Sequence, residues 1–346
     1  MLHQLKDRYK KLFPENHCAV IFILYVGFFL IHTLLVTSTQ KDHKYDYNVA
    51  TVVLFSEIAK LCASICIHSW NTSFSELIQE VKSGKNLIWY YMVPAVLYCL
   101  YNNLLYVSLS GFDPASYYVL MQFRMVITGV LFQIIFKKQL KKMQWISLII
   151  LTIGCIIKQL KLNGSEGLSF EVNIYLFFIF AQMLCSCFAG VYTESILKTR
   201  GLGVSVMVQN VFFYIDSIFC NLALLAYNGK IFTFLNHENI VPVLNPKVIL
   251  IIIMTTLIGI TVSLFLRHMN SILKIFASAT GMLFSAVFSL LIFGIPIGIN
   301  KMISICFILV ALYLYSSDPV KNQPTKSDIE KAKKAAGVKE SIVECE

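Results

Sequence analysis

The sequence predicts an all-α integral membrane protein with ten transmembrane helices. Of its 346 residues, 57% are apolar and only 14% are charged, whereas about a quarter of the residues in a soluble domain are charged. At about 20 apolar residues for each membrane helix, this content allows at most about ten helices. The apolar residues do not alternate with polar ones, as the strands of a membrane β-barrel require. Little of the chain is left for a soluble catalytic domain.

Ten apolar runs, each bounded by charged residues, Gly or Pro, mark the predicted helices. In chain order they cover residues 18–37, 48–70, 87–109, 114–136, 143–160, 172–196, 204–227, 247–266, 274–294 and 297–316. Most connections between them are short, as in packed helix bundles. The last residues are charged and nearly free of aromatic groups, a composition typical of disorder. The predicted parts are a cytosolic N-terminal segment (1–17), a first five-helix repeat (18–160), a second five-helix repeat (172–316) and a disordered cytosolic tail (317–346).

The division into two repeats is supported by a faint internal similarity. KMQWISLIILTIG, which starts at Lys142, resembles KMISICFILVALY, which starts at Lys301, and the two starts are 159 residues apart. Five helices in each half would give the halves opposite orientations in the membrane, which is the inverted repeat of many secondary transporters. The match alone is weak evidence, because any two apolar helices resemble each other.

The basic residues predict the orientation. With both termini in the cytosol, 20 Lys and Arg residues fall on the cytosolic side and seven on the other, as the positive-inside rule requires. The net charge of +10 is therefore explained by loops that orient the protein, and no nucleic-acid partner is expected. The ten cysteines form no Cys-x-x-Cys pair, so neither a zinc site nor a disulfide framework is predicted.

Four charged residues stand out inside predicted helices, where a charge costs on the order of 3 kcal/mol. They are Glu57, Lys60, Arg124 and Asp216. Glu57 and Lys60 are three residues apart and can pair on one helical face. Such a pair is either a self-neutralising structural element or part of a polar cavity.

Arg124 lies about 15 Å along the fourth predicted helix, near the middle of the membrane. No acidic residue lies within one turn of it. A guanidinium group binds phosphate oxygens in bidentate geometry, so an anionic ligand is one explanation for this position. The alternative is an acidic partner on another helix, such as Asp216.

Aromatic and amide side chains accompany this charge on neighbouring helices. The third, fourth and seventh helices carry Tyr98, Asn102, Asn103, Tyr117, Gln122, Asn210 and Tyr214. Aromatic rings stack on nucleobases and amides bind their polar edges, so this set favours a nucleotide ligand. Hydrogen bonds between packed helices are the alternative explanation.

The remaining candidates lie at helix ends and at small residues. Arg267, Asn270 and Lys274 surround the junction of the eighth and ninth helices, which is either a site where a helix N-terminus favours phosphate or an ordinary basic cytosolic turn. Ser186 and Gly190 on the sixth helix permit close approach of a helix or a ligand. Asn163 begins a glycosylation sequon on the non-cytosolic side. The chain has no Walker, Rossmann or His-Glu-x-x-His motif, so no catalytic residue, metal or cofactor is predicted.

The chain resembles the nucleotide-sugar transporter family over about residues 18–316, in the branch that carries CMP-sialic acid, UDP-galactose and UDP-N-acetylglucosamine. The similar segments are YCLYNN (98–103), FDPASYY (112–118), GVLFQIIFKK (129–138), QWISLIILTIGC (144–155), CSCFAGVY (185–192) and MNSILKIFASA (269–279). The resemblance implies a drug/metabolite transporter fold and a multi-pass protein of the Golgi membrane. It also implies import of a nucleotide sugar, with UDP-galactose as the first expectation, in exchange for the nucleoside monophosphate UMP.

The resemblance also assigns roles to residues. Arg124 and Lys274 would bind phosphate, with Arg267 nearby, and Glu57 and Lys60 would meet the sugar. The other implied substrate-binding residues are Tyr98, Asn102, Asn103, Tyr117, Gln122, Ser186, Gly190, Tyr192, Asn210, Tyr214, Asp216 and Asn270. Arg124 stands where the family has Lys, and Asn270 and Ser271 stand where it has Asp and Asn. Glycosyltransferases or a second copy of the chain remain open as partners beside the lipid bilayer. Transport of another small anion, or an adaptor role without transport, remains open too.

Overall fold

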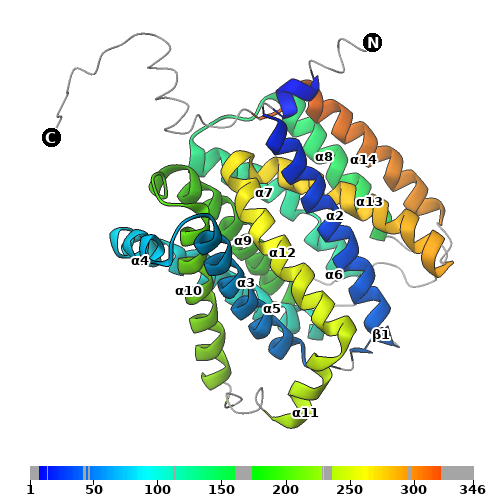
Figure 1. Ribbon diagram of the computed structural model, residues 1–346. Helices are drawn as coiled ribbons and strands as arrows, with labels where there is room; N and C mark the ends of the chain where they lie inside the picture. The colour runs from blue at the N-terminus through cyan, green and yellow to red at the C-terminus, as the bar shows by residue number, and fades with distance from the viewer. Residues whose placement is uncertain are drawn as a thin grey trace, which may run out of the picture.

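The computed structural model describes residues 8–13, 15–41, 44–45, 47–111, 114–159, 174–227, 229, 236–294 and 298–320, and they form a bundle of long helices (Figure 1). The first half contains α2 (Asn16–Thr39), α3 (Val49–Asn71), α4 (Phe74–Ser83), α5 (Leu87–Gly111), α6 (Pro114–Met121), α7 (Arg124–Phe136) and α8 (Lys142–Gln159). Between α2 and α3, two short antiparallel strands, β1 (Gln40–Lys41) and β2 (Lys44–Tyr45), pair Gln40 with Tyr45 and Lys41 with Lys44.

The second half begins with α9 (Ile174–Ser195), which continues into a π-helical turn, η1 (Ile196–Arg200). It then contains α10 (Val206–Tyr227), α11 (His237–Ile240), the 3₁₀ turn η3 (Val241–Leu244), α12 (Pro246–His268), α13 (Ser271–Phe293) and α14 (Ile299–Ser317). The predicted glycosylation residue Asn163 lies outside the described residues, as do residues 1–7 of the predicted N-terminal segment and the predicted tail beyond residue 320.

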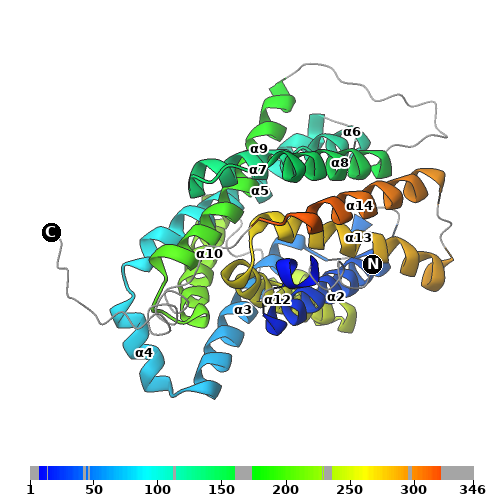
Figure 2. The same ribbon diagram turned by 90° about the horizontal axis from the view of Figure 1, so that it is seen from above.

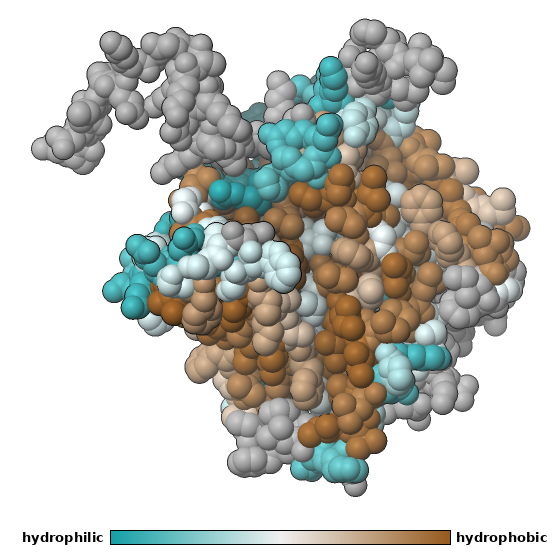
Figure 3. Space-filling model, viewed as in Figure 1, coloured by the Kyte–Doolittle hydropathy of each residue, from teal (hydrophilic) through white to brown (hydrophobic). Residues whose placement is uncertain are grey.

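Eight helical segments in the described part of the chain are long and apolar enough to cross a membrane. They cover Asn16–Thr39, Val49–Trp70, Tyr117–Phe136, Ile174–Arg200, Val206–Tyr227, Pro246–His268, Ser271–Phe288 and Ile299–Ser317. The predicted helical architecture with membrane-length segments is thereby confirmed, and β1 and β2 are the only strands among the described residues. Helices α5 and α8 correspond to two further predicted spans but are not among the eight, so the number ten stays a prediction. The flank of the bundle in Figure 3 is apolar, and polar residues gather toward its ends.

The span predicted over residues 114–136 is present as one membrane-length segment, Tyr117–Phe136, but it contains a break. That segment is broken at Gln122 and Phe123, which separate α6 from α7. The backbone N–H of Gln122 donates to the Val119 carbonyl and not to the Tyr118 carbonyl, which a regular α-helix would use. The Gln122 side-chain amide donates to the Tyr118 carbonyl at 3.0 Å. The side chain replaces the missing backbone donor, so the Tyr118 carbonyl keeps a hydrogen bond. The helix is therefore interrupted here although neither Gly nor Pro is present.

A second difference concerns α4, which lies where the sequence predicts only a connection between two membrane helices. Ser73 caps it by accepting a hydrogen bond from the Glu76 N–H at 3.3 Å. Within α4, Leu77 is buried while most other residues are exposed. Such an amphipathic segment lies on a surface, and its capping serine and acidic first turn are ordinary helix signals that the apolar-run criterion overlooks.

The packing follows a regular scheme. Helix α2 packs on α12 and α13, and α9 packs in the same way on α5 and α7. Likewise α3 packs on α12 while α10 packs on α5, and α3–α10, α7–α13 and α8–α14 are direct pairs. Each of these contacts is preserved when the helices of the first half are exchanged for their counterparts in the second. The counterparts of α2, α3, α5, α7 and α8 are α9, α10, α12, α13 and α14. Seen from above, α9 therefore lies with α5, α7 and α8, and α2 lies with α12, α13 and α14 (Figure 2).

Candidate functional site

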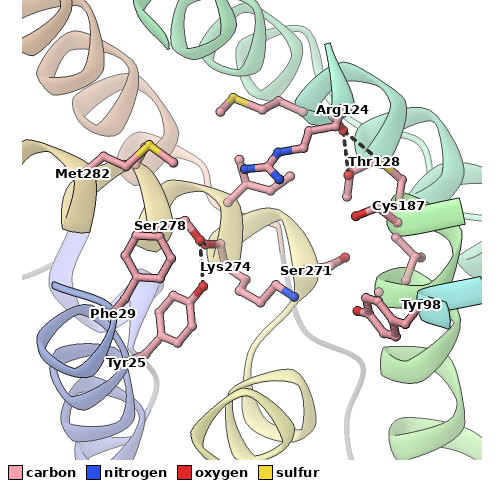
Figure 4. Close-up of a pocket in the computed structure, with 16 residues that line it drawn as sticks. Tyr25, Phe29, Tyr98, Arg124, Thr128, Cys187, Ser271, Lys274, Ser278 and Met282 are labelled. Atoms are coloured by element: carbon pink, nitrogen blue, oxygen red, sulfur yellow. Dashed lines mark hydrogen bonds between the residues drawn. The ribbon is translucent and has the colours of Figure 1, made fainter. Parts of the chain in front are cut away.

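A cavity of about 250 Å³ lies between α2, α5, α7, α9 and α13. Its walls combine aromatic, hydroxyl and apolar side chains with two cations (Figure 4). The lining residues are Tyr25, Phe29, Tyr98, Arg124, Met125, Thr128, Ser186, Cys187, Gly190, Val191, Ser271, Lys274, Ile275, Ser278, Ala279 and Met282. No acidic residue is among them.

The two cations of the cavity are Arg124 and Lys274. Arg124 is the first residue of α7, and Lys274 is the fourth residue of α13. Both side chains extend into the cavity in Figure 4. The ion pairs found among the described residues are those of His17, Lys60, Lys141 and Lys198, so neither Arg124 nor Lys274 pairs with a carboxylate there.

The alternative explanation for Arg124, a partnership with Asp216, is not what the structure shows. Asp216 is buried, and its Oδ2 has no hydrogen-bond partner among the described residues. No ion pair joins Asp216 to Arg124 in that part of the chain. The charge of Arg124 is therefore available to a ligand.

Two helix N-termini converge on the same cavity. The N-termini of α7 and α13 each carry a partial positive charge from the aligned peptide dipoles. The first turn of α13 is capped, because Ser271 N–H donates to Glu194 Oε2 at 2.7 Å and Leu273 N–H donates to Asn270 Oδ1 at 2.8 Å. Phe123, which precedes α7, provides no side-chain cap. Because the Glu194 carboxylate already occupies the N-terminus of α13, the two cations are the main source of positive charge in this space.

The walls formed by α7 and α13 correspond residue by residue. Arg124, Met125 and Thr128 are matched by Lys274, Ile275 and Ser278, each pair 150 residues apart. In both helices the hydroxyl one turn after the cation donates to the cation's own backbone carbonyl, at 2.8 Å from Thr128 and 3.0 Å from Ser278. The two halves of the chain thus contribute the same local arrangement to one cavity.

A similar correspondence relates α2 to α9. Tyr25 and Phe29, four residues apart on α2, face Cys187 and Val191 on α9 with the same spacing, and all four line the cavity. The Tyr25 hydroxyl bonds to Ser278 at 2.7 Å, and Cys187 donates to the Arg124 carbonyl at 3.2 Å. Each of these helices therefore contacts the cation-bearing helix of the other half.

Five of the residues predicted from the sequence meet in the cavity, and several lining residues were not predicted. The five are Tyr98, Arg124, Ser186, Gly190 and Lys274. Sequence reasoning missed Tyr25, Phe29, Thr128, Cys187, Ser271 and Ser278. A usable signal existed for Thr128 and Ser278, which follow the two cations by one helical turn and hence share their faces.

Glu57 and Lys60 lie in a separate polar cluster. Their predicted ion pair is confirmed at 2.7 Å, with side chains that are only 12% and 13% exposed. Lys60 Nζ lies 5.7 Å from the ring centre of Tyr214, a cation–π distance. A Cβ placed on Gly259 would lie 3.0 Å from both Lys60 and the Tyr214 hydroxyl, so α12 closes tightly over this cluster. None of these groups lines the cavity.

The remaining predicted polar residues also lie outside the cavity lining. Tyr117 donates to Gln182 at 3.2 Å, which is a hydrogen bond between α6 and α9. Asn103 donates to the Cys99 carbonyl at 2.7 Å, while its neighbour Asn102 is half-buried on α5. Bonds of this kind match the alternative interpretation of these residues as contacts within and between helices.

Three further predicted residues, Tyr192, Gln122 and Asn210, have individual settings. Tyr192 stacks on Phe188 with ring centres 5.6 Å apart. Gln122 uses its amide nitrogen at the break between α6 and α7. The amide nitrogen of Asn210 is buried on α10 and has no hydrogen-bond partner among the described residues.

The junction of α12 and α13 is held by a buried network. Lys198 pairs with Glu194 at 2.7 Å, with side chains 4% and 1% exposed, and also donates to the Met269 carbonyl. Arg267 donates to the Leu197 carbonyl, and Asn270 donates to the Val320 carbonyl at 3.2 Å. Arg267 and Asn270, both predicted site residues, thus fix the helix break that places Lys274, and neither lines the cavity.

The described residues contain no cluster of metal-binding side chains. No group of three or more His, Cys, Asp or Glu side chains is placed to hold a metal ion there. The nine cysteines in the same part of the chain are unpaired thiols.

Comparisons with known proteins identify the family of the chain. The sequence pattern described as nucleotide-sugar transporter matches residues 16–316. The chain belongs to the nucleotide-sugar transporter family. It is 40% identical to the UDP-galactose transporter senju of Drosophila melanogaster, over 92% of this chain and 91% of senju. It is 29% identical to CMP-sialic acid transporter 2 of Oryza sativa subsp. indica, over 85% and 81% of the two chains.

A solved crystal structure of a protein shares the fold of this nucleotide-sugar transporter family member. The TM-score is 0.61 at 11% identity, covering 88% of this chain and 97% of the other. The resemblance to the family that the sequence predicts is confirmed. The chain is a multi-pass membrane transporter and not an enzyme.

Proposed function

We propose that this transporter carries UDP-galactose, and other UDP-sugars of similar size, into the Golgi lumen in exchange for UMP. The observation that carries the proposal is the cavity in which Arg124 and Lys274, without carboxylate partners among the described residues, meet the N-termini of α7 and α13. Each uncompensated charge in the membrane interior costs on the order of 3 kcal/mol. A ligand with phosphate groups offsets that cost. The name of the relative senju gives the expectation of UDP-galactose.

In this proposal the two cations bind the phosphates, because guanidinium and ammonium groups both bond to phosphate oxygens. Tyr98 and Tyr25 offer aromatic faces and hydroxyls at the cavity wall for the base and ribose. Glu57 and Lys60 would meet the sugar in a state of the transporter in which the cavity extends toward α3. Asn102, Tyr117, Asn210 and Tyr214 would join the site in the same way.

The proposed architecture has ten membrane helices in two inverted five-helix repeats, with both termini in the cytosol. The exchange-symmetric packing of α2–α8 against α9–α14 supports it, as does the correspondence of Arg124 with Lys274 in sequence and in place. A central cavity between two equivalent halves suits alternating access by rocking of the halves. No ATP is needed, since UMP leaving the lumen drives the exchange.

The test is a thermal-shift panel of the purified protein with UMP, CMP, GMP and AMP. A ligand that binds only the folded state stabilises it by roughly 2.7 kcal/mol at a hundredfold excess over its dissociation constant. UMP should raise the unfolding temperature, and the other three nucleotides should not. A shift with CMP alone would move the assignment to CMP-sugars, and no shift with any of the four would favour a different small anion.

Uptake into proteoliposomes completes the test. Vesicles loaded with UMP should take up labelled UDP-galactose saturably, and empty vesicles should not. A protein that binds UMP but gives no uptake in either case would be an adaptor that kept the fold without transport.

A further inference from the structure

A second cavity, of about 310 Å³, lies at the end of the bundle where α7 leads into α8 and where α14 ends. It is lined by Phe132, Lys138, Gln139, Leu140, Lys141, Gln144, Asp318, Pro319 and Val320. None of these residues lines the cavity of Arg124 and Lys274. The proposed function therefore leaves this second cavity unused.

The second cavity is cationic. Four lysines occur within residues 137–142, and Lys138 and Lys141 belong to the lining itself. Asp318, the acidic residue of the lining, is engaged by Lys141 at 2.8 Å. Lys138 is half-buried and forms no ion pair in the described part of the chain. Burial and the nearby charge of Lys198 lower the pKa of Lys138, while the Glu194 carboxylate raises it, and an anion beside Lys138 would act in the same direction as Glu194.

The walls are fixed by hydrogen bonds that leave Lys138 free. The Gln144 side chain accepts from the Lys141 N–H at 3.0 Å and donates to the Asp318 carbonyl at 2.9 Å. These bonds tie the N-terminus of α8 to the segment that follows α14. The N-terminus of this 18-residue helix adds a partial positive charge to the same place.

The cavity opens at the boundary of the apolar surface. Phe132 and Leu140 form an apolar part of its lining. On the outside of the same helices, Ile134 is 64% exposed and Ile146 is 44% exposed, within two turns of the lysines. Side chains of this kind face lipid in a membrane helix, so a molecule in the cavity would have a charged end beside Lys138 and an apolar end along α7 and α8.

The geometry points to a binding site for the phosphate-bearing headgroup of an anionic phospholipid in this second cavity. Basic pockets between membrane helices on the cytosolic side recognise such headgroups. The lysines supply the charge, Gln139 and Gln144 supply further polar groups, and the adjoining apolar surface accommodates the acyl chains. A free anion would use the lysines alone and gain nothing from the apolar wall.

The experiment is a titration of the detergent-purified full chain followed by native mass spectrometry. The probes are dioctanoyl phosphatidylinositol 4-phosphate, dioctanoyl phosphatidylcholine and inorganic phosphate. The inositol lipid should bind, the zwitterionic lipid should bind much more weakly, and inorganic phosphate should not displace the bound lipid. Displacement by inorganic phosphate at equal concentration would overturn the lipid assignment in favour of a soluble anion.

The decisive variant is Lys138→Gln, which breaks no ion pair in the described residues and should fold. It should weaken binding of the inositol lipid about fivefold, the effect expected for one cation near a membrane surface. Lys138→Gln/Lys141→Gln should weaken it about 25-fold on the same basis. The matched control is Lys82→Gln/Lys85→Gln, which removes two exposed lysines at the C-terminal end of α4 and should leave lipid binding unchanged.

A second control separates this site from the proposed function. Arg124→Gln should lose UMP stabilisation and keep binding of the inositol lipid. Lys138→Gln with unchanged lipid binding would overturn the inference, whatever the outcome with UMP.

Discussion

Lys198 and Arg124 are both cations inside the helix bundle, yet their surroundings are opposite. Lys198 is 4% exposed and lies 2.7 Å from Glu194, and it also bonds to the Met269 carbonyl. Arg124 has no carboxylate partner among the described residues and extends into a cavity. Burying a charge is tolerated when it is paired and hydrogen-bonded. The comparison therefore separates a cation that holds the fold from a cation that, in the proposed function, binds a ligand.

Lys60 and Lys274 repeat the same contrast. Lys60 is paired with Glu57 at 2.7 Å beneath a tightly packed α12, whereas Lys274 lines the cavity opposite Arg124. The paired cations lie within one turn of their acids on the same helical segment. The unpaired cations lie near the starts of α7 and α13, on separate halves of the chain.

The largest effect, on the free energy of unfolding, is expected when a buried cation loses its acidic partner. Glu194→Ala removes the partner of Lys198 and the cap on Ser271. Breaking a buried ion pair costs about 3–5 kcal/mol, so the free energy of unfolding should fall by that amount. Thermal unfolding of the purified protein measures it. Glu194→Ala/Lys198→Met should recover part of the loss, because no unpaired charge remains; an equally unstable double variant would contradict this explanation.

The next largest effect concerns transport instead of stability. Arg124→Gln or Lys274→Gln should reduce UMP-driven uptake of UDP-galactose by about 10- to 150-fold, because a hydrogen bond to a charged group contributes roughly 1.5–3 kcal/mol. The unfolding temperature without ligand should stay the same or rise. Arg124→Lys, which keeps the charge, is the control and should retain part of the uptake. Full uptake by Arg124→Gln would remove this residue from phosphate binding.

A smaller effect should distinguish the two explanations of the Glu57–Lys60 cluster. If these residues meet the sugar, Glu57→Gln/Lys60→Gln lowers affinity for UDP-galactose about tenfold, by loss of one charge-assisted hydrogen bond. Affinity for UMP, which has no sugar, should stay unchanged. Competition binding with both ligands on the same preparation measures the difference. Equal loss for the two ligands would indicate a structural role.

The smallest effect is expected at Gly190 in the cavity wall. A Cβ there would meet the Tyr98 hydroxyl at 3.8 Å, an ordinary contact, so Gly190→Ala should raise the free energy of unfolding by only about 0.5–1 kcal/mol, the helix-propensity gain of Ala over Gly. Uptake should weaken modestly, because the methyl group occupies part of the cavity. A kinetic comparison of uptake with wild type measures this.

Gly154 provides the control in a packed interface. A Cβ there would lie 2.8 Å from the Phe307 Cβ, between α8 and α14. Gly154→Ala should therefore cost about 1–3 kcal/mol of stability through overpacking. If Gly190→Ala and Gly154→Ala were equally stable, the proposed difference between the open cavity wall and the packed α8–α14 interface would be wrong.

Some of the fold and site could be predicted because the interactions involved are local. The Glu57–Lys60 and Glu194–Lys198 pairs follow from spacings of three and four residues on a helix. Arg124 was identified because no acid lies near it in sequence. The break beside it was not predictable from Gly or Pro, since a glutamine side chain produces it. The helix α4 was not predicted because it is short and amphipathic, so it forms no long apolar run.

The sequence by itself determined that this chain is a helical membrane protein, where its long helices run and which charges lie within them. These properties depend on composition and on the helical period, which act over a few residues. Only the tertiary structure decided which charges are paired and which residues share a cavity. Tyr25 and Ser278, 253 residues apart, bond beside Lys274, and Arg124 meets Lys274 from the other half of the chain. Such contacts depend on how helices pack, and a linear pattern does not record them.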